Sequence, residues 1–554
     1  MPKIEVARRD LERLCPSLPG DDAVLEELLA SLKGELKTGG ELLKIELNDT
    51  NRPDLWCAEG VARGISALNG YSRRYLVDLP EPSVRIEVDD SVTAVRPWIA
   101  AFKASGPPID EEALAALVAA QEKLAGSFGR NRKTAAIGFY RSGCISFPVR
   151  YSAVPRDSVR FTPLGCDSEM TLSGVLSDTE TGRKYAHLVE EGALCPLISD
   201  SSGSVLSFPP VINSEGTGRV SVGDRDLFCE VTGTDWNTVG LTASILACNL
   251  EDRGFRIEPV EIGYPRETPD GGSVSITPRR FCDTLSTTRE RISTVLGILP
   301  DDAAIERSMA GMGWDSWTID GAVVEARMPP YRHDGMHEVD LIEDIAVGYG
   351  LNRFEPLMPE GYTIGASAAI EDLADAVRIM LAGAGCEEVL LPILTSEGRP
   401  GTPPGIVRIE NPMTLEYGAV RNSLIPGLLG VEAVSSHTPY PHRVFEVGEV
   451  LENGSGDLRT VVRLAVSISG NDAGFGDVHS VIGLICHGRG HSLALTPSGD
   501  DRFIPGRSCT LMVDGREAGV MGEVHPSILD ELGITRPVAA FELDLESLGG
   551  AVQG

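Results

Sequence analysis

Hydrophobic spacing predicts the elements of the first part of the chain. The segment "KIEV" is typical of a short strand, and residues 21–37 follow a helical pattern with one apolar stripe made of Leu25, Leu28, Leu29 and Leu32. A strand, a loop and a second helix are predicted in 41–71, with Asp54 as the helix N-cap and Gly70 as its stop. A proline-containing stretch near 79–84 marks a boundary, so we expect an amino-terminal α/β domain over 1–85.

Residues 86–265 mix helical and strand patterns. A helix near residues 110–123 is followed by a loop that holds Arg130, Arg132 and Lys133. Short strand patterns separated by Gly, Ser and Pro come next, and a long helix follows the segment "EVTGTD". We therefore expect one α+β domain over this region.

Two more domains are predicted after the linker-like stretch "GYPRETPDGGS". Residues 270–354 predict a strand, a turn and short helices, and the last helix should bury the stripe Val339, Ile342, Ala346 and Tyr349. Residues 355–554 predict a helix followed by strands in "EEVLLPILT", "RVFEVGEVL", "RLAVSISG" and "GREAGVMGEV". The fold class is therefore a multidomain α+β protein.

Length and composition agree with this division. A chain of 554 residues exceeds the roughly 250–300 at which single cores stop growing. No apolar run approaches the ~20 residues of a membrane span, and the start has no apolar signal-peptide core. The eleven cysteines occur without any CxxC, which is typical of free thiols in a reducing cytoplasm. We expect a cytoplasmic protein with no membrane partner.

The charge is strongly acidic, at −32. This disfavours non-specific nucleic-acid binding by the chain as a whole, although a basic partner subunit could supply phosphate contacts. All eight lysines lie at or before Lys184, and every later basic residue is arginine. GC-rich coding, an acidic proteome or selection for forked guanidinium contacts would each produce that pattern.

Four carboxylates gather near residue 340. Asp340, Glu343 and Asp344 share one face of the predicted helix, and Asp334 lies in the loop before it. A solvated face, a capped helix start with Asp334 as N-cap, and a hard-metal site all fit this pattern. Oxygen-only ligands suit Mg²⁺, whereas the nearby histidines lack the cysteine partners and spacing of a zinc site.

Polar residues also follow two strand patterns beside glycine. Asn213, Ser214 and Glu215 come after "FPPVI", and Thr234 with Asp235 end the strand pattern "EVTG". Such positions can line a small-ligand pocket. They can equally be turn and cap residues, with Asp235 capping the helix that follows.

Several segments in order resemble the β subunit of phenylalanyl-tRNA synthetase in its archaeal and eukaryotic-cytosolic form. They are "IELNDTNRPDLWCAEGVARGI", "VLSFPPVINSEGTG" with "EVTGTD", "MPPYRHDGMHEVDLIEDIAVGYGLNRFEP", "ENPMTLEYGAVRNSLIPGLL", "FEVGEV" and "FIPGRS" with "GEVHP". The resemblance covers nearly the whole chain. It implies an editing domain at 86–265, a small winged-helix-like metal-bearing domain at 270–354, and a class II synthetase-like antiparallel sheet domain at 355–554.

The resemblance also implies partners and site residues. The family forms a heterotetramer of two α and two β chains in which the α chain uses ATP to attach phenylalanine to its tRNA. The β chain would bind tRNA and hydrolyse mischarged tyrosyl-tRNA, with Ser214 and Asp235 in the pocket. The family's magnesium positions, shared with the α chain, fall on the four carboxylates at 334, 340, 343 and 344.

A working ATP site is not predicted in this chain. A class II site needs one arginine on a hairpin and another in a Gly-rich strand-to-helix motif, because each grips a phosphate. Arg421 could be the first, but the glycines around Arg489 precede no apolar helix with an inward arginine. We then expect Arg421 either to form a structural ion pair or to pack against the α chain. Two rival functions remain: a free-standing hydrolase, and an architectural subunit whose editing pocket is inactive.

Overall fold

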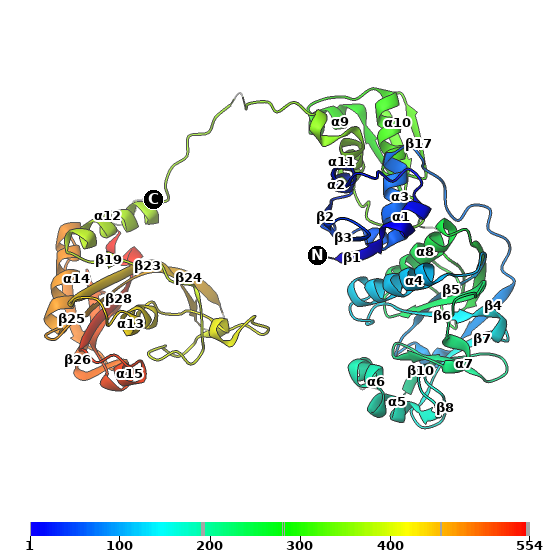
Figure 1. Cartoon of the computed structure of the whole chain (residues 1–554). Coiled ribbons are helices and arrows are strands. Elements are labelled where there is room, and N and C mark those ends of the chain that lie inside the picture. The colour runs from blue at the N-terminus through cyan, green and yellow to red at the C-terminus, as the bar shows by residue number, and fades with distance from the viewer. Residues whose placement is uncertain are drawn as a thin grey trace. The chain divides into compact units, whose positions relative to one another are not determined.

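The computed structural model describes residues 2–189, 194–279, 281, 283–359, 361–454 and 457–549. The chain divides between Leu357 and Met358 into two compact units, each described by itself below (Figure 1). Among the described residues, no helix is both long and apolar enough to cross a membrane. Ten cysteines are described and all are free thiols, whereas Cys282 lies outside the described residues.

The first unit begins with a three-stranded antiparallel sheet in the order β1-β3-β2. Its strands are β1 (Lys3–Ala7), β2 (Gly34–Thr38) and β3 (Leu42–Leu47), and its helices are α1 (Arg8–Leu14), α2 (Asp22–Ser31) and α3 (Ala58–Leu68). The leucine stripe predicted for the first helical segment contributes Leu25 and Leu29 to the core. Helix α3 ends at Leu68 with Asn69 as its C-cap, and Gly70 follows with a φ of 86°, as predicted.

Two predictions in this part are wrong. The helix expected over 21–37 ends at Ser31, because Lys33 takes a left-handed φ of 55° and the chain then pairs with β3 as strand β2. Asp54 does not cap α3. It lies in a 3-10 turn (Pro53–Leu55) and accepts two hydrogen bonds from Arg52, both at 2.8 Å, while Cys57 is the N-cap.

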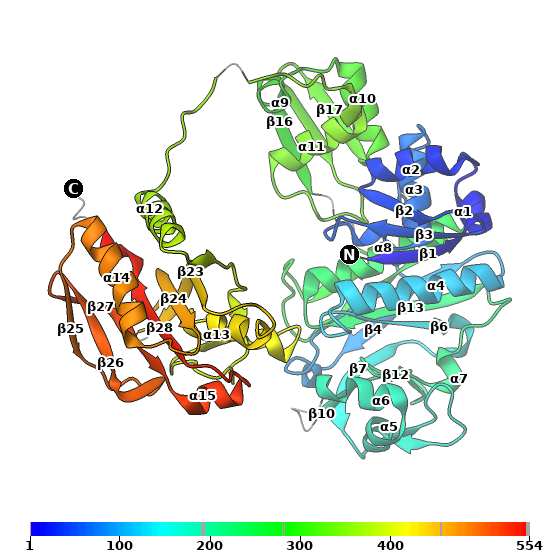
Figure 2. The same ribbon diagram turned by 60° about the vertical axis from the view of Figure 1, so that its left-hand side comes forward.

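A mixed ten-stranded sheet is the largest element of the unit. Its order is β12-β11-β10-β7-β4-β14-β5-β13-β6, with β15 on β14. The strands are β4 (Val84–Val88), β5 (Trp98–Ser105), β6 (Ala136–Arg141), β7 (Val149–Pro155), β10 (Leu194–Ser199), β11 (Val205–Phe208), β12 (Ile212–Asn213), β13 (Asp226–Gly233), β14 (Arg256–Gly263) and β15 (Val274–Thr277). Helices α4 (Glu111–Lys123) and α8 (Trp236–Asp252) lie along it, as Figure 2 shows. Strand β15 was expected in the next domain, but it completes this sheet.

A subdomain and a short helix extend this sheet. The subdomain contains β8 (Arg160–Phe161), β9 (Met170–Thr171), α5 (Leu172–Asp178) and α6 (Glu180–Tyr185), and helix α7 (Glu215–Gly218) follows β12. Phe161, Leu172, Val175 and Tyr185 of the subdomain pack with Phe208 in one core cluster. The subdomain therefore rests on the β11 end of the sheet.

The last part of the first unit holds the sheet β16-β18-β17 and three helices. They are β16 (Thr284–Thr288), β17 (Ser316–Asp320), β18 (Val323–Arg327), α9 (Arg289–Leu296), α10 (Asp302–Gly311) and α11 (Glu338–Tyr349). Helix α11 exists as predicted, but its buried face differs. Ile342 and Ala346 of the predicted stripe are buried, whereas Val339 is exposed and Leu341 and Ile345 are buried in addition. The face is rotated because Asp344, expected on the polar side, is buried against Arg332.

The second unit is built on a seven-stranded sheet in the order β19-β23-β24-β28-β27-β26-β25. The strands are β19 (Glu387–Glu388), β23 (His442–Asn453), β24 (Leu458–Ser469), β25 (Leu493–Pro497), β26 (Phe503–Val513), β27 (Arg516–Val524) and β28 (Val538–Asp544). Helices α12 (Ala369–Gly383) and α14 (Phe475–Arg489) cover one face, and α13 (Ile425–Val434) with α15 (Pro526–Glu531) the other. A small sheet joins β20 (Leu394–Thr395), β22 (Ala419–Val420) and β21 (Val407–Arg408).

Candidate functional site

The first unit holds a cavity of about 690 Å³ between the ten-stranded sheet, α4 and the chain around β12. Most of its walls are apolar, with Leu117 on α4, Phe139 on β6 and Pro209 to Ile212 before and in β12. The polar side chains of its lining include Gln121, Arg132, Ser207, Asn213 and Glu230, which come from different elements. Apolar walls with a few placed polar groups are typical of a small-ligand site. We call this the β13 cavity.

Glu230 is the buried acid of the β13 cavity. It lies in the middle of β13, and its side chain is 3% exposed. Tyr140 donates its hydroxyl proton to Glu230 Oε1 at 2.9 Å, while Oε2 has no hydrogen-bond partner among the described residues. Burial raises the pKa of Glu230 to about 7. One carboxyl oxygen of Glu230 is therefore buried without a hydrogen-bond donor from the described residues.

Two glycines make room for this arrangement. A Cβ on Gly138, which pairs with Glu230 across the β6–β13 ladder, would come within 2.3 Å of the Tyr140 hydroxyl and 2.5 Å of Glu230 Oε1. A Cβ on Gly218 would lie 2.4 Å from Cβ of Asn213. The Tyr140–Glu230 pair and the Asn213 side chain thus both occupy space that a larger residue would fill.

The predicted pocket residues lie in different places in the structure, and only some of them line the β13 cavity. Asn213 lines the β13 cavity, where its Oδ1 lies 3.4 Å from the Tyr140 hydroxyl. Ser214 is buried and caps α7, and Glu215 pairs with Arg219 and accepts from the Gly165 amide at 2.8 Å. Ser214 and Glu215 hold the turn that carries Asn213.

Thr234 and Asp235 do not line the β13 cavity. The Thr234 hydroxyl donates to the Lys133 carbonyl at 3.2 Å, and Asp235 accepts from the Thr238 amide at 2.7 Å as N-cap of α8. The capping role that the sequence also allowed for Asp235 is the one observed. Asp235 lines a second hollow, which it shares with Lys123 and Arg130.

Sequence reasoning missed Glu230, Tyr140 and Ser207. Glu230 lies between Cys229 and Val231 in a strand whose residues are otherwise almost all buried. An acid inside a fully buried strand is rare unless it is paired. That contrast was the available signal, but the pairing with β5 and β6 that buries the strand cannot be read from the segment itself.

The four carboxylates near residue 340 line a second, small cavity, together with Arg52 and Arg332. Arg332 donates to both oxygens of Asp334, at 2.9 and 2.7 Å, and to Asp344 at 2.7 Å. Burial alone would raise the pKa of Asp334, but Arg332 lowers it to about 2. Two of the four carboxylates are therefore paired with one buried guanidinium.

The other two carboxylates have different roles. Asp340 accepts from the amides of Met336 and His337, both at 2.8 Å, in a capping box with His337 as N-cap. The cap expected at Asp334 thus falls on His337. Glu343 is exposed and pairs with Lys33 at 2.8 Å.

The donor set suits Mg²⁺, since all four side chains offer only oxygen. The arrangement within this chain is not a closed site. Among the residues that the structure describes, no three acidic, histidine or cysteine side chains converge on one ion position.

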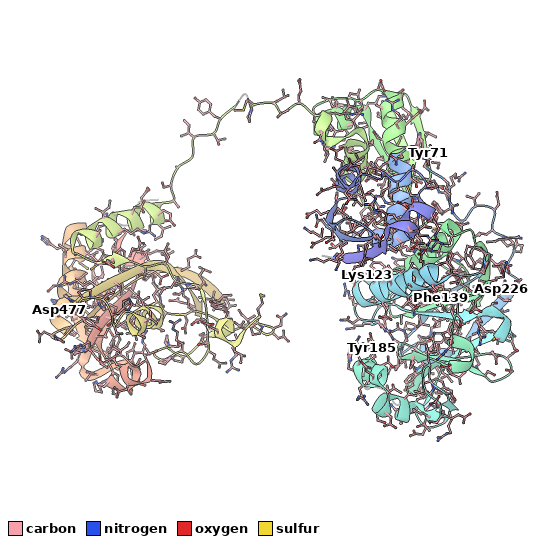
Figure 3. The ribbon with its side chains drawn as sticks, in the orientation of Figure 1. Tyr71, Lys123, Phe139, Tyr185, Asp226 and Asp477 are labelled. Carbon is pink, nitrogen blue, oxygen red and sulfur yellow. The ribbon has the colours of Figure 1, made fainter. Side chains whose placement is uncertain are left out.

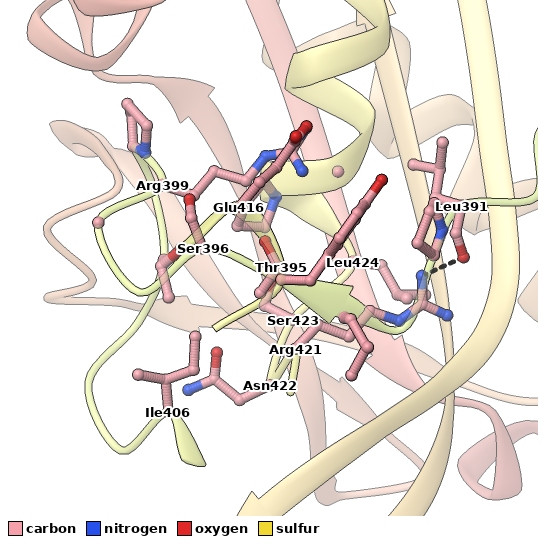
Figure 4. A pocket seen from close by; sticks show the side chains of 18 residues that line it. Leu391, Thr395, Ser396, Arg399, Ile406, Glu416, Arg421, Asn422, Ser423 and Leu424 are labelled. Carbon is pink, nitrogen blue, oxygen red and sulfur yellow. Dashed lines mark hydrogen bonds between the residues drawn. The ribbon is translucent and has the colours of Figure 1, made fainter. Parts of the chain in front are cut away.

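The second unit has its own cavity, of about 380 Å³, lined by residues between Leu391 and Gly427 (Figure 4). Arg421 is buried there and donates to the carbonyls of Glu449 and Leu391, at 2.8 and 3.2 Å. It also forms an ion pair with Glu446 at 2.7 Å. The structural ion pair that the sequence allowed for Arg421 is observed, so its guanidinium is already engaged by protein groups.

Two family models match parts of the chain. Residues 355–545 match the phenylalanyl tRNA synthetase beta chain CLM domain, and residues 285–351 match the tRNA synthetase B5 domain.

Relatives and a solved structure extend the similarity over the whole chain. The phenylalanine–tRNA ligase beta subunit of Thermococcus kodakarensis is 35% identical over 582 residues, which cover 99% of each chain. That of Pyrococcus furiosus is 35% identical over 99% of this chain and all of the relative. The crystal structure of an N-terminal fragment of the phenylalanyl-tRNA synthetase beta-subunit from Pyrococcus horikoshii covers 63% of this chain with 34% identity and a TM-score of 0.57.

Proposed function

The chain belongs to the family of phenylalanine–tRNA ligase β subunits, and we propose that its first unit removes tyrosine wrongly attached to tRNA. The observation that carries this proposal is the buried carboxyl of Glu230, whose Oε2 is unpartnered in a cavity with apolar walls. We also propose the four-domain division at 1–85, 86–265, 270–354 and 355–554, with strand β15 of the third range added to the sheet of the second domain. In that division the β13 cavity belongs to the second domain.

The cavity distinguishes tyrosine from phenylalanine by one hydroxyl. The apolar walls accept either aromatic ring, so they supply little discrimination by themselves. Tyrosine would donate its phenolic proton to Glu230 Oε2, whereas phenylalanine would leave that buried oxygen without a partner. A site that hydrogen-bonds a substrate hydroxyl rejects the analogue lacking it far more strongly than an apolar pocket rejects an added group. Glu230 would thus direct hydrolysis to the wrong product.

The remaining polar residues would position the ester. Asn213 lines the cavity and is held in place by the turn that Ser214 caps. Attack by water on the aminoacyl ester would release tyrosine and return the 3′-terminal hydroxyl of the tRNA. Thr234 and Asp235 would act as positioning residues, because they fix the chain that enters α8 and the loop beside it.

The test is Glu230→Ala in the assembled enzyme. Loss of a buried polar contact costs about 1–3 kcal/mol, so kcat/KM for tyrosyl-tRNA hydrolysis should fall about 5- to 150-fold. Phenylalanine attachment should stay unchanged. Ser221→Ala, an exposed change at the rim of the same cavity, is the matched control. Unchanged hydrolysis in Glu230→Ala would contradict the proposal, and no hydrolysis by the wild-type enzyme would favour the architectural alternative.

Synthesis of phenylalanyl-tRNA would take place on an α subunit in an (αβ)₂ heterotetramer, with ATP as its substrate. Arg421, the one candidate for an ATP-gripping arginine, is engaged by Glu446 and two carbonyls in this chain. The β20-β22-β21 sheet and its neighbours expose apolar side chains in Leu390, Ile393, Leu394, Met413, Leu415 and Tyr417. Apolar exposure on that scale is typical of a subunit contact, so we assign this surface to the α subunit.

The four carboxylates would hold Mg²⁺ only after assembly. Glu343 is exposed and Asp340 is half-buried, whereas Arg332 pairs with Asp334 and Asp344. Ligands from the α subunit would complete the set. The bound ion would supply positive charge that holds the two chains together at this helix, and the B5 match suggests that tRNA binds nearby.

A further inference from the structure

The lysines of this chain fall into two groups. Five of the eight are paired with carboxylates, namely Lys3, Lys33, Lys37, Lys44 and Lys103. The other three, Lys123, Lys133 and Lys184, form no ion pair with any described residue. We call them the unpaired lysines.

The unpaired lysines and Arg130 lie around the loop that connects α4 to β6. Lys133 and Arg130 belong to it, and Lys123 is the last residue of α4, which leads into it. Arg130, also exposed, forms no ion pair among the described residues. Lys184 lies near Tyr185, with its Nζ 5.1 Å from the ring centre, and Arg132 of the loop lies over the same ring at 4.2 Å. Figure 3 shows Lys123 and Tyr185 on the same flank of the first unit.

The backbone of this loop is held in an uncommon conformation. Arg130, Asn131 and Arg132 have successive positive φ values of 49°, 54° and 68°. Runs of left-handed residues without glycine are rare and persist only where the surroundings fix them. Here the buried Arg96 donates to the carbonyls of Arg132 and Lys133, at 3.0 and 3.1 Å, and Thr234 also donates to Lys133. The loop is therefore preorganised.

Its amides are not available to a ligand, so side chains must carry any binding. The amides of residues 130–134 all donate to carbonyls between Ala125 and Arg130. Lys123 and Arg130 line an open hollow of about 740 Å³ together with Phe128 and Trp56. Asp235 is the acidic residue in that hollow, and its carboxylate accepts from its own helix at Thr238. The hollow thus combines the cationic side chains of Lys123 and Arg130 with the aromatic rings of Phe128 and Trp56.

The loop is also a wall of the β13 cavity. Arg132 lines that cavity and donates to the carbonyls of Pro210 and Val211, at 3.2 and 3.1 Å. Glu122 of the cavity rim is the neighbour of Lys123 and pairs with Arg132 at 2.9 Å. One short segment, 121–134, therefore lines the hollow on one side and the cavity on the other.

We propose that Lys123, Arg130 and Lys133 bind the sugar-phosphate backbone of the tRNA acceptor strand and deliver its aminoacylated end to the β13 cavity. This rests on the proposed function, since it takes the cavity as the ester site. The strand carries one phosphate per nucleotide and extends from the ester, so it must cross the rim of the cavity. Cations that neutralise backbone phosphates release counterions, which gives binding a salt dependence independent of base sequence.

The experiment compares two triple variants of the assembled enzyme. One is Lys123→Gln with Arg130→Gln and Lys133→Gln. The control removes three paired lysines of the first sheet, Lys3→Gln, Lys37→Gln and Lys44→Gln, with the same change in charge. Transfer-RNA affinity is measured from 0.05 to 0.3 M NaCl. Tyrosine release is measured from tyrosyl-tRNA and from tyrosyl-adenosine, which lacks the backbone phosphates.

The loop variant should bind tRNA about 10- to 100-fold more weakly at 0.1 M salt, with a salt slope smaller by about 2, because each single-strand contact contributes about 0.7. Its KM for tyrosyl-tRNA should rise while kcat, and the rate on tyrosyl-adenosine, stay at wild-type values. The control should match wild type. Affinity and slope equal to those of the control would overturn the proposal, as would loss of the heterotetramer, which would make the loop a subunit contact.

The two proposals fail differently. If the cavity does not hydrolyse tyrosyl esters, wild-type enzyme releases no tyrosine from either substrate, and the tRNA affinities still decide the role of the loop. If the cavity hydrolyses but the loop does not bind tRNA, Glu230→Ala lowers tyrosine release while the loop variant behaves as the control.

Discussion

At the scale of single residues, Glu230 couples the candidate site to pH. Burial raises its pKa from 4.5 to about 7, so the folded state holds a proton that the unfolded state releases between those values. The free energy of unfolding should therefore fall as pH rises from about 4.5 to 7, because the folded state favours the protonated carboxyl. Above pH 7 the free energy of unfolding should stay level with respect to this group. Ionising the group inside the cavity costs up to about 3 kcal/mol, from 1.36 kcal/mol per pKa unit.

Glu230→Gln removes that titration. Its stability relative to wild type should improve by up to about 3 kcal/mol between pH 4.5 and pH 8, read as a difference in the unfolding of the first unit followed by circular dichroism and denaturant. Tyr140→Phe keeps the carboxyl and should retain a pH-dependent loss. Parallel pH profiles for wild type and Glu230→Gln would mean that Glu230 does not titrate in this range.

Gly138 gives a second residue-scale prediction. In Gly138→Ala the new methyl group needs the space of the Tyr140 hydroxyl and Glu230 Oε1, so that pair must move apart. Tyrosyl-tRNA hydrolysis should fall about 10-fold or more in kcat/KM while tRNA affinity stays constant. Gly143→Ala is the control, since its Cβ meets nothing within 4 Å. Equal hydrolysis by both variants would show that the exact position of the pair is unimportant.

At the scale of elements, periodicity located most helices and long strands, and contacts between elements decided the rest. Helices α3, α8, α11 and α12 and strands β23, β24 and β27 were predicted from their own residues. The buried face of α11 was predicted only in part, because Arg332, from outside the helix, makes burial of Asp344 favourable. Asn213 was predicted as a pocket residue because it follows a strand pattern. Glu230 could be recognised only from the pairing of β13 with the strands on both sides of it. Local pattern cannot supply such partners.

The acidic helix α11 allows its carboxylates to be tested separately. Asp334→Ala leaves Arg332 buried with one partner fewer, so it should destabilise the first unit by about 3–5 kcal/mol. Glu343→Ala removes an exposed pair and should change stability by less than about 1 kcal/mol. If Glu343 binds a shared Mg²⁺, the same variant should weaken assembly with the α subunit.

The readout for Glu343→Ala is the heterotetramer dissociation constant with Mg²⁺ and with a chelator. Lys33→Gln is the control, because it breaks the same ion pair without removing a ligand. A dissociation constant that is unchanged by Glu343→Ala, by Mg²⁺ and by the chelator would contradict the proposed metal site.

At the scale of the whole molecule, the chain consists of two units with separate cores. Residues 355–359 and 361–368 form neither helix nor strand and expose Leu357, Met358, Tyr362 and Ile364. Chymotrypsin should therefore cut here first and release two fragments that each keep their secondary structure, as mass spectrometry and circular dichroism would show. Early cleavage elsewhere, or unfolding of either fragment, would mean that the units depend on each other.

The unpaired lysines have a practical consequence for chemistry on this protein. An amine that is held in an ion pair reacts slowly with acylating reagents, whereas Lys123, Lys133 and Lys184 carry no such pairing. Because no lysine follows Lys184, the second unit offers no ε-amine at all. A lysine-selective fluorophore added in small excess would thus mark the flank of the β13 cavity, and acetyl groups placed there would neutralise the same flank that we assign to tRNA.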